Sequence, residues 1–158
     1  MCSKEMKYYF SFLIFGILFI SVGRSQTNVS AKNLNLKNGL AIEGYDPVAY
    51  FTQNKAIKGN AKYNVSIGVV RYHFSNQKKK ELFQKDRDKY LPEYGGWCAY
   101  AMGENGDKIE IDPKTYKIRN GKLYLFYHTW ALNTLNKWNQ NESALNRKAD
   151  ANWLKMNH

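Results

Sequence analysis

Two stretches of the chain alternate apolar and polar residues with a period of two, and each predicts a β-hairpin. The first pairs residues 63–66 with residues 69–74 around an Ile-Gly turn. The second pairs residues 116–119 with residues 122–127 around an Asn-Gly dipeptide, which favours a type I′ turn. The sequence therefore predicts two small antiparallel hairpins.

Other stretches place apolar residues three and four positions apart, which is the spacing of an amphipathic helix. We expect one helix over residues 75–83 with Ser75 as its N-cap, and another over residues 129–139 with Thr129 as its N-cap. A last helix is expected over residues 143–154. Small hairpins covered by short helices, with two helices at the C-terminus, predict an α+β domain.

The N-terminal residues differ in pattern from the rest of the chain. An apolar run over residues 8–20 follows two lysines and precedes small residues, and it is shorter than the roughly 20 residues of a spanning helix. We interpret residues 1–25 as a cleaved signal peptide, residues 26–37 as a flexible leader and residues 38–158 as the folded domain. Cleavage predicts an exported protein, periplasmic or secreted. The alternative is an uncleaved membrane anchor.

The charge of the chain changes this picture only slightly. The net charge is +11, but the basic residues are scattered, and the one dense run, residues 78–80, falls on a predicted helix. Such runs usually form a solvated face. We expect no nucleic-acid partner, because phosphate binding needs basic residues gathered on one face. Weak association with an anionic envelope surface is compatible with the charge.

One short motif combines glycine with a helix start. Gly44 and Tyr45 precede Asp46, whose carboxylate can accept hydrogen bonds from the free amides of a helix N-terminus. Pro47 suits the first helical position, where its missing N–H costs nothing. We therefore predict a structural role for this motif, as a turn followed by a capped helical turn.

A second motif, YGGWCAYAM over residues 94–102, is denser in unusual residues. Gly95 and Gly96 permit backbone conformations that other residues avoid, and an aromatic residue and a thiol follow at once. Cys98 is the only cysteine outside the predicted signal peptide. Any thiol chemistry of the mature chain must therefore start here.

Together these motifs resemble the exported, single-domain branch of the YHS domain family. The resemblance spans about residues 38–154 and rests on five blocks in order, residues 44–51, 72–75, 94–101, 121–125 and 149–153. It implies metal binding, because YHS domains look related to small cysteine-rich metal-sensing modules and occur fused to heavy-metal transporting ATPases. It implies no settled activity. One cysteine replaces the pair or more of cysteine-richer members, which argues against a closed zinc site.

The first functional hypothesis is a soft-metal site. If the second motif is helical, Cys98 and Met102 lie on one face, and His128 or His73 could add an imidazole. Thiolate, thioether and imidazole ligands favour copper(I) or a similar soft transition metal. The alternative is that Cys98 is a small core residue beside Met102. A thiol enzyme would need an oriented base, and no spacing in the sequence provides one.

The second hypothesis is a binding module without catalysis, in which Cys98 is structural. Aromatic residues are abundant for a domain of this size, and they suit a small apolar or planar ligand or a protein partner. The residues expected to line such a pocket are Tyr50, Tyr94, Trp97, Tyr100 and Tyr124. The alternative is that these aromatics fill the core.

Overall fold

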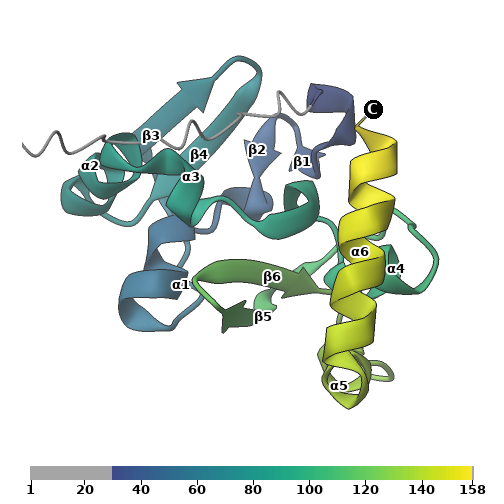
Figure 1. Ribbon diagram of the computed structural model, residues 1–158. Coiled ribbons are helices and arrows are strands. Elements are labelled where there is room, and N and C mark those ends of the chain that lie inside the picture. Colours follow the sequence, from purple (N-terminus) through teal and green to yellow (C-terminus); the bar gives the residue numbers. More distant parts are fainter. Residues whose placement is uncertain (1–29, 158) are drawn as a thin grey trace, which may run out of the picture.

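The computed structural model describes residues 30–157, and the predicted signal peptide lies outside this range. The first predicted hairpin is confirmed and forms one side of a four-stranded sheet with the strand order β1-β2-β4-β3 (Figure 1). In it β3 (Asn60–Ile67) pairs antiparallel with β4 (Val70–Phe74). β4 then pairs parallel with β2 (Leu40–Ala41), and β1 (Leu36–Lys37) is the outer strand beside β2.

The second predicted hairpin is also confirmed. β5 (Asp112–Arg119) pairs antiparallel with β6 (Lys122–Phe126), and the turn residues Asn120 and Gly121 have φ values of 50° and 72°. Both values are positive, as a type I′ turn requires. The glycine-rich segment runs parallel to the other edge of β6, through a bridge from Cys98 to Leu125.

Three helices pack near the four-stranded sheet: α1 (Pro47–Gln53), α2 (Gln77–Lys85) and α3 (Arg87–Tyr90). The predicted N-cap of α2 was wrong by one residue. Asn76 caps this helix, because its side-chain oxygen accepts the amide of Lys79 at 3.0 Å. The fold class predicted from the sequence, α+β, is confirmed.

The other three helices are α4 (Ala99–Glu104), α5 (Thr134–Gln140) and α6 (Glu142–Met156). α4 packs against α6, which runs along one side of the molecule (Figure 1). The helix expected to begin at Thr129 begins instead at Thr134, with Asn133 as its N-cap. The prediction failed because the preceding residues form a hydrogen-bonded loop.

The segment predicted as a flexible leader belongs, from its sixth residue on, to the folded unit. Ala31–Asn33 form a 3-10 helix, and the side-chain amide of the buried Asn33 donates to the carbonyl oxygen of Met156 at 3.0 Å and to Oδ1 of Asn157 at 2.9 Å. This segment shows no periodicity because its contacts are made with residues 156 and 157, far away in the sequence. Two further 3-10 helices are Ile42–Gly44 and Glu93–Gly96.

The core consists of two clusters of apolar side chains. One lies around Phe74 and Phe83 at the four-stranded sheet, and the other lies around Trp138 and Met102 at α4, α5 and α6. Cys98 belongs to the first cluster. Within residues 30–157, no helix is both long enough and apolar enough to cross a bilayer.

Candidate functional site

A pocket of about 580 Å³ lies between the four-stranded sheet and the segment that contains the two adjacent glycines. Its lining comes from segments far apart in the chain, including β4, α3, the glycine segment and α6. The apolar and aromatic part of the lining includes Leu34, Leu36, Ile42, Val70, Tyr72, Leu91, Tyr94 and Trp153. The volume lies within the range of about 300–1,000 Å³ that is usual for small-molecule sites.

The glycine segment forms one wall of this pocket because three consecutive residues have a left-handed backbone. The φ values are 53° for Tyr94, 62° for Gly95 and 87° for Gly96. A Cβ atom on Gly95 would lie 2.7 Å from Cη2 of Trp153 and 3.0 Å from the carbonyl oxygen of Asn33. Gly95 therefore lets this wall approach both α6 and the N-terminal segment.

Tyr94 anchors the same wall to α6. Its hydroxyl donates to Oδ1 of Asp150 at 2.9 Å and accepts from Nδ2 of Asn146 at 2.7 Å. Burial, and then the neighbouring Asp150 charge, raise the pKa of Tyr94 above its usual range. The phenol therefore remains neutral, and its position is fixed by two hydrogen bonds.

Polar side chains also line the pocket, among them Tyr72, Arg87, Asp88 and Glu93. Nε of Arg87 lies 3.0 Å from Oδ1 of Asp88, and we call the part of the pocket around Arg87 and Tyr72 its polar end. Burial raises the pKa of Tyr72 to about 12, against the opposing effect of the Arg87 charge. The Tyr72 hydroxyl makes no hydrogen bond to residues 30–157, and its oxygen is accessible to solvent. A protonated hydroxyl and a guanidinium can therefore meet the polar end of a ligand here.

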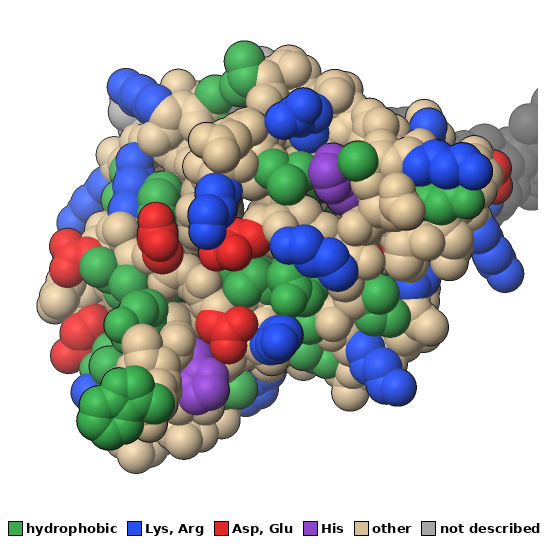
Figure 2. Space-filling view, turned by 180° about the vertical axis from the view of Figure 1, so that it is seen from behind, with side chains coloured by type: hydrophobic (Ala, Val, Ile, Leu, Met, Phe, Trp, Pro, Cys, Tyr) green, Lys and Arg blue, Asp and Glu red, His purple; other side chains and the backbone are tan. Residues whose placement is uncertain are grey.

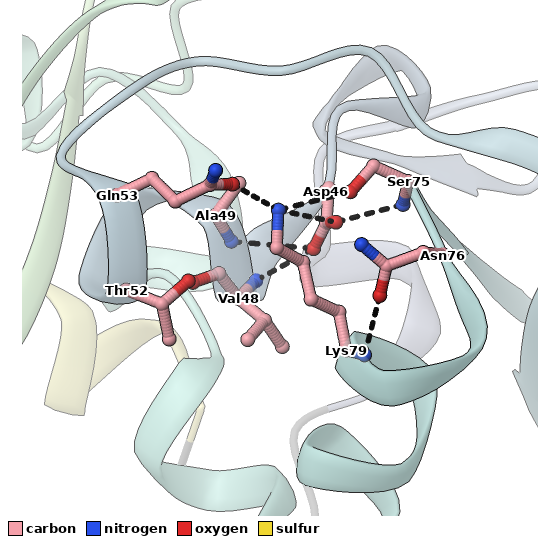
Figure 3. Close-up of polar contacts among 8 residues, drawn as sticks. All are labelled: Asp46, Val48, Ala49, Thr52, Gln53, Ser75, Asn76 and Lys79. Atoms are coloured by element: carbon pink, nitrogen blue, oxygen red, sulfur yellow. Dashed lines mark hydrogen bonds and ion pairs between the residues drawn. The ribbon is translucent and has the colours of Figure 1, made fainter.

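The first glycine motif has a different structure, in which the carboxylate of Asp46 is fully buried and fully used (Figure 3). Its Oδ1 accepts from the amides of Val48 at 3.0 Å and Ala49 at 3.3 Å, and its Oδ2 accepts from the amide of Ser75 at 2.7 Å. The prediction that Asp46 caps the helix beginning at Pro47 is therefore confirmed. The same carboxylate also joins α1 to the end of β4.

A lysine closes this polar cluster. The ammonium of Lys79 lies 3.7 Å from Oδ2 of Asp46, and it donates to Oγ of Ser75 at 2.9 Å and to Oε1 of Gln53 (Figure 3). Its side chain is only 9% exposed. A buried charge is tolerated when a partner charge and hydrogen bonds surround it. The cluster therefore has a structural role, as the sequence predicted for Asp46.

The thiol of Cys98 is fully buried at the start of α4. Its sulfur accepts from the amide of Tyr127 at 3.3 Å and lies 3.4 Å from Oγ1 of Thr134. The hydroxyl of Thr134 donates to the carbonyl oxygen of Tyr127 at 2.8 Å, so the thiol is the donor in its contact with Thr134. Both polar neighbours of the sulfur are therefore groups of the chain itself, at the two ends of the loop between β6 and α5.

The other residues of the soft-metal hypothesis occupy different places. The buried side chain of Met102 packs in the second core cluster, and Nδ1 of the exposed His128 lies 3.3 Å from Oδ2 of Asp112. His73 lies on β4, on the face opposite the core. Burial, and then the charges of Arg71 and Lys58, lower the pKa of His73.

No group of three or more His, Cys, Asp or Glu side chains suited to a metal ion is found in the part of the chain that the structure describes. The copper hypothesis stays a prediction.

The five aromatic residues proposed as pocket lining are distributed over several places. Tyr94 lines the pocket, and Tyr100 lines a separate hollow of about 350 Å³ between α4, α5 and α6. Tyr50 is buried, and its hydroxyl donates to the carbonyl oxygen of Pro113 at 2.7 Å. Tyr124 packs in the second core cluster, and Trp97 is half-buried beside it.

Sequence reasoning missed most of the pocket lining. Tyr72, Arg87 and Leu91 line the pocket, and none of them is among the residues predicted to do so. The only local signal was the pair of glycines, because the remaining lining comes from segments that fold together without any shared periodicity. Such sites become visible only when the topology is known.

Comparison with known proteins found no matching family model, no matching curated protein and no matching solved structure. The resemblance to the YHS family therefore stays a prediction that rests on the five sequence blocks.

Proposed function

We propose that this protein is a non-catalytic binding module that holds a small, largely apolar ligand in the pocket beside Gly95 and Gly96. The observation that carries the proposal is the pocket itself, about 580 Å³ in volume, with apolar walls and one polar end. Apolar walls with a few placed polar groups are typical of small-molecule sites. In this proposal Cys98 is structural, which its two hydrogen bonds support.

The lining restricts the chemical class of the ligand. Tyr72, Tyr94 and Trp153 offer aromatic surface to a planar or aliphatic body. Arg87 and the free hydroxyl of Tyr72 would meet an acceptor group, such as a carboxylate or carbonyl. The lining includes no His or Cys side chain, so the proposal assigns no reaction to the pocket.

The proposal is tested with 1-anilinonaphthalene-8-sulfonate, an aromatic anion whose emission rises when it enters an apolar site. We expect saturable binding at one probe per chain. Ala31→Trp should weaken this binding about tenfold, because the exposed Ala31 lines the pocket and an indole there would fill it. Lys32→Trp is the matched control, since Lys32 is its exposed neighbour and does not line the pocket.

Two further variants test the polar end. Arg87→Gln should weaken probe binding several-fold by removing the positive charge, and Tyr72→Phe should act in the same direction by removing one hydroxyl. Tyr63→Phe on β3 is the control. If Ala31→Trp and Lys32→Trp bind the probe equally well, the probe does not occupy this pocket and the proposal is wrong.

A further inference from the structure

Trp130 stands out because its side chain is 99% exposed. In contrast, Trp138 is fully buried, and Trp97 and Trp153 are half-buried. Tryptophan is highly buried on average in folded proteins, so an indole that is almost fully exposed at the tip of a loop is unusual. The loop that carries Trp130 is therefore a candidate interaction surface.

The loop is held in one shape by its own backbone. The amide of Thr129 donates to the carbonyl oxygen of Leu132 at 2.8 Å, and the reverse bond measures 3.3 Å. A bridge joins His128 to Asn133 below this turn. Trp130 and Ala131 thus occupy the tip of a closed turn, so little conformational entropy is lost when the indole binds.

The base of the loop is attached to the core at the buried thiol. Tyr127 donates its amide to Sγ of Cys98, and its carbonyl oxygen accepts from the amide and the hydroxyl of Thr134, at 3.1 Å and 2.8 Å. Cys98 lies 3.4 Å from the same hydroxyl. The cysteine therefore positions the loop, although it lies at the opposite end from the exposed indole.

Two exposed lysines near the loop can meet an anionic partner. Residues 127–133 contain no acidic side chain, and Oδ2 of Asp112 lies 3.3 Å from Nδ1 of His128. Lys114 follows Asp112 by two residues, and Lys137 is the fourth residue of α5, with its ammonium 5.7 Å from the centre of the Tyr100 ring. Both lysines are exposed, and neither forms an ion pair with any residue from 30 to 157.

We propose that the loop over residues 127–133 docks on an anionic lipid bilayer, with Trp130 at the level of the headgroups and Lys114 and Lys137 beside the lipid phosphates. Indole rings favour the membrane interface, and each nearby lysine adds attraction to anionic lipids. A protein interface of standard size needs about 800 Å² from each partner, whereas this loop offers one isolated indole. The net charge of +11 acts in the same direction.

The test uses the full chain with vesicles of phosphatidylcholine and phosphatidylglycerol, or of phosphatidylcholine alone. Bromine atoms on the acyl chains near the headgroup quench indoles that enter the interface. We expect the anionic vesicles to quench the indole fluorescence of the wild type strongly. In Trp130→Ala the part of this quenching that comes from Trp130 should be lost. Binding should weaken about tenfold in this variant, because the indole provides most of the buried apolar area.

Matched variants separate the contributions of the indole and the charges. Leu154→Ala removes another exposed apolar side chain, 55% exposed on α6, and should bind as the wild type does. Lys114→Gln and Lys137→Gln should each weaken binding to the anionic vesicles about fivefold and leave the weak binding to phosphatidylcholine unchanged.

Any attachment through the N-terminal residues is common to all these variants, so the quenching difference between wild type and Trp130→Ala reports on the loop alone. Equal quenching in these two proteins would overturn the proposal. Equal binding to the two kinds of vesicle would overturn its electrostatic part.

Discussion

The two glycine-led motifs of this chain use similar residues for opposite purposes. In the first, Asp46 is fully buried, and all its acceptor capacity is directed at neighbouring elements. In the second, Tyr94 is bonded to α6 behind the wall, while Gly95 and Gly96 line an open pocket. The first motif forms hydrogen bonds only within the chain, so it stabilises the fold. The second motif leaves one face of Gly95 and Gly96 open to the pocket, where a ligand could contact it.

The largest effect is expected at the first motif. Asp46→Ala should lower the free energy of unfolding by about 3–5 kcal/mol, because it removes the helix cap and leaves the buried Lys79 ammonium without its partner charge. Chemical denaturation monitored by circular dichroism measures this change. Asp88→Ala, in an exposed pair with Arg87, is the control and should cost less than about 0.5 kcal/mol.

The double variant Asp46→Ala with Lys79→Met sharpens the first prediction. It removes the unpaired charge together with its partner, so part of the lost stability should return. A double variant no more stable than Asp46→Ala would show that the cap, and not the ion pair, accounts for the loss.

An intermediate effect is expected at the second motif, from Gly95→Ala compared with Gly121→Ala. Both glycines have a positive φ, so both substitutions strain the backbone, at a cost of about 1 kcal/mol. Only Gly95 has close neighbours, whereas no atom lies within 4 Å of a Cβ placed on Gly121. Gly95→Ala should therefore cost about 1–2 kcal/mol more than Gly121→Ala in the same denaturation assay.

Probe binding distinguishes the two glycine variants a second time. Gly95→Ala shifts a wall of the pocket and should weaken binding of the anilinonaphthalene probe, whereas Gly121 does not line the pocket, so Gly121→Ala should leave binding unchanged. Equal stability and equal probe binding in both variants would contradict the close packing of this wall against α6.

The smallest effect is expected at the contact between Asp112 and His128, in which Oδ2 lies 3.3 Å from Nδ1. Burial alone would raise the pKa of Asp112. Hydrogen bonds from the backbone amide of Lys114 and from the side chains of His128 and Thr115 outweigh this effect and lower the pKa below its ordinary value of 3.8. A lowered carboxyl pKa contributes stability above the unfolded-state pKa, and this contribution is lost as the pH falls through the folded-state pKa.

Asp112→Asn should therefore reduce stability slightly at pH 7, and the difference from wild type should shrink below about pH 4. Both side chains are partly exposed, so the effect should stay below about 1 kcal/mol. Thermal unfolding across this pH range measures it, with Glu110→Gln as an exposed control. A difference that grows at acid pH would contradict the ion pair.

The features that could be predicted from the sequence are local ones. The Asp46 cap and the turn at Asn120 and Gly121 depend on residues adjacent in sequence, so their residue types were sufficient. The errors came from competing contacts. Ser75 was expected to cap α2, but its amide is bonded to Asp46 and its hydroxyl accepts from Lys79, which leaves the cap to Asn76.

The candidate site was less predictable than the fold, for the same physical reason. The pocket needs Tyr72 from β4, Arg87 from α3 and Trp153 from α6. No periodicity or spacing connects these three residues. Likewise, the thiol of Cys98 was identified as unusual from its neighbours in sequence, but its partners Tyr127 and Thr134 could be known only once the chain had folded.

The hydrogen bonds from Asn33 to the last two described residues have a consequence for how the chain folds. They join positions 123 and 124 residues apart, which is close to the largest sequence separation possible within residues 30–157. Loop-closure entropy must be lost before such contacts form, which slows folding. During synthesis residues 31–33 emerge long before their partners, and the pocket lacks its Trp153 wall until residue 153 has left the ribosome.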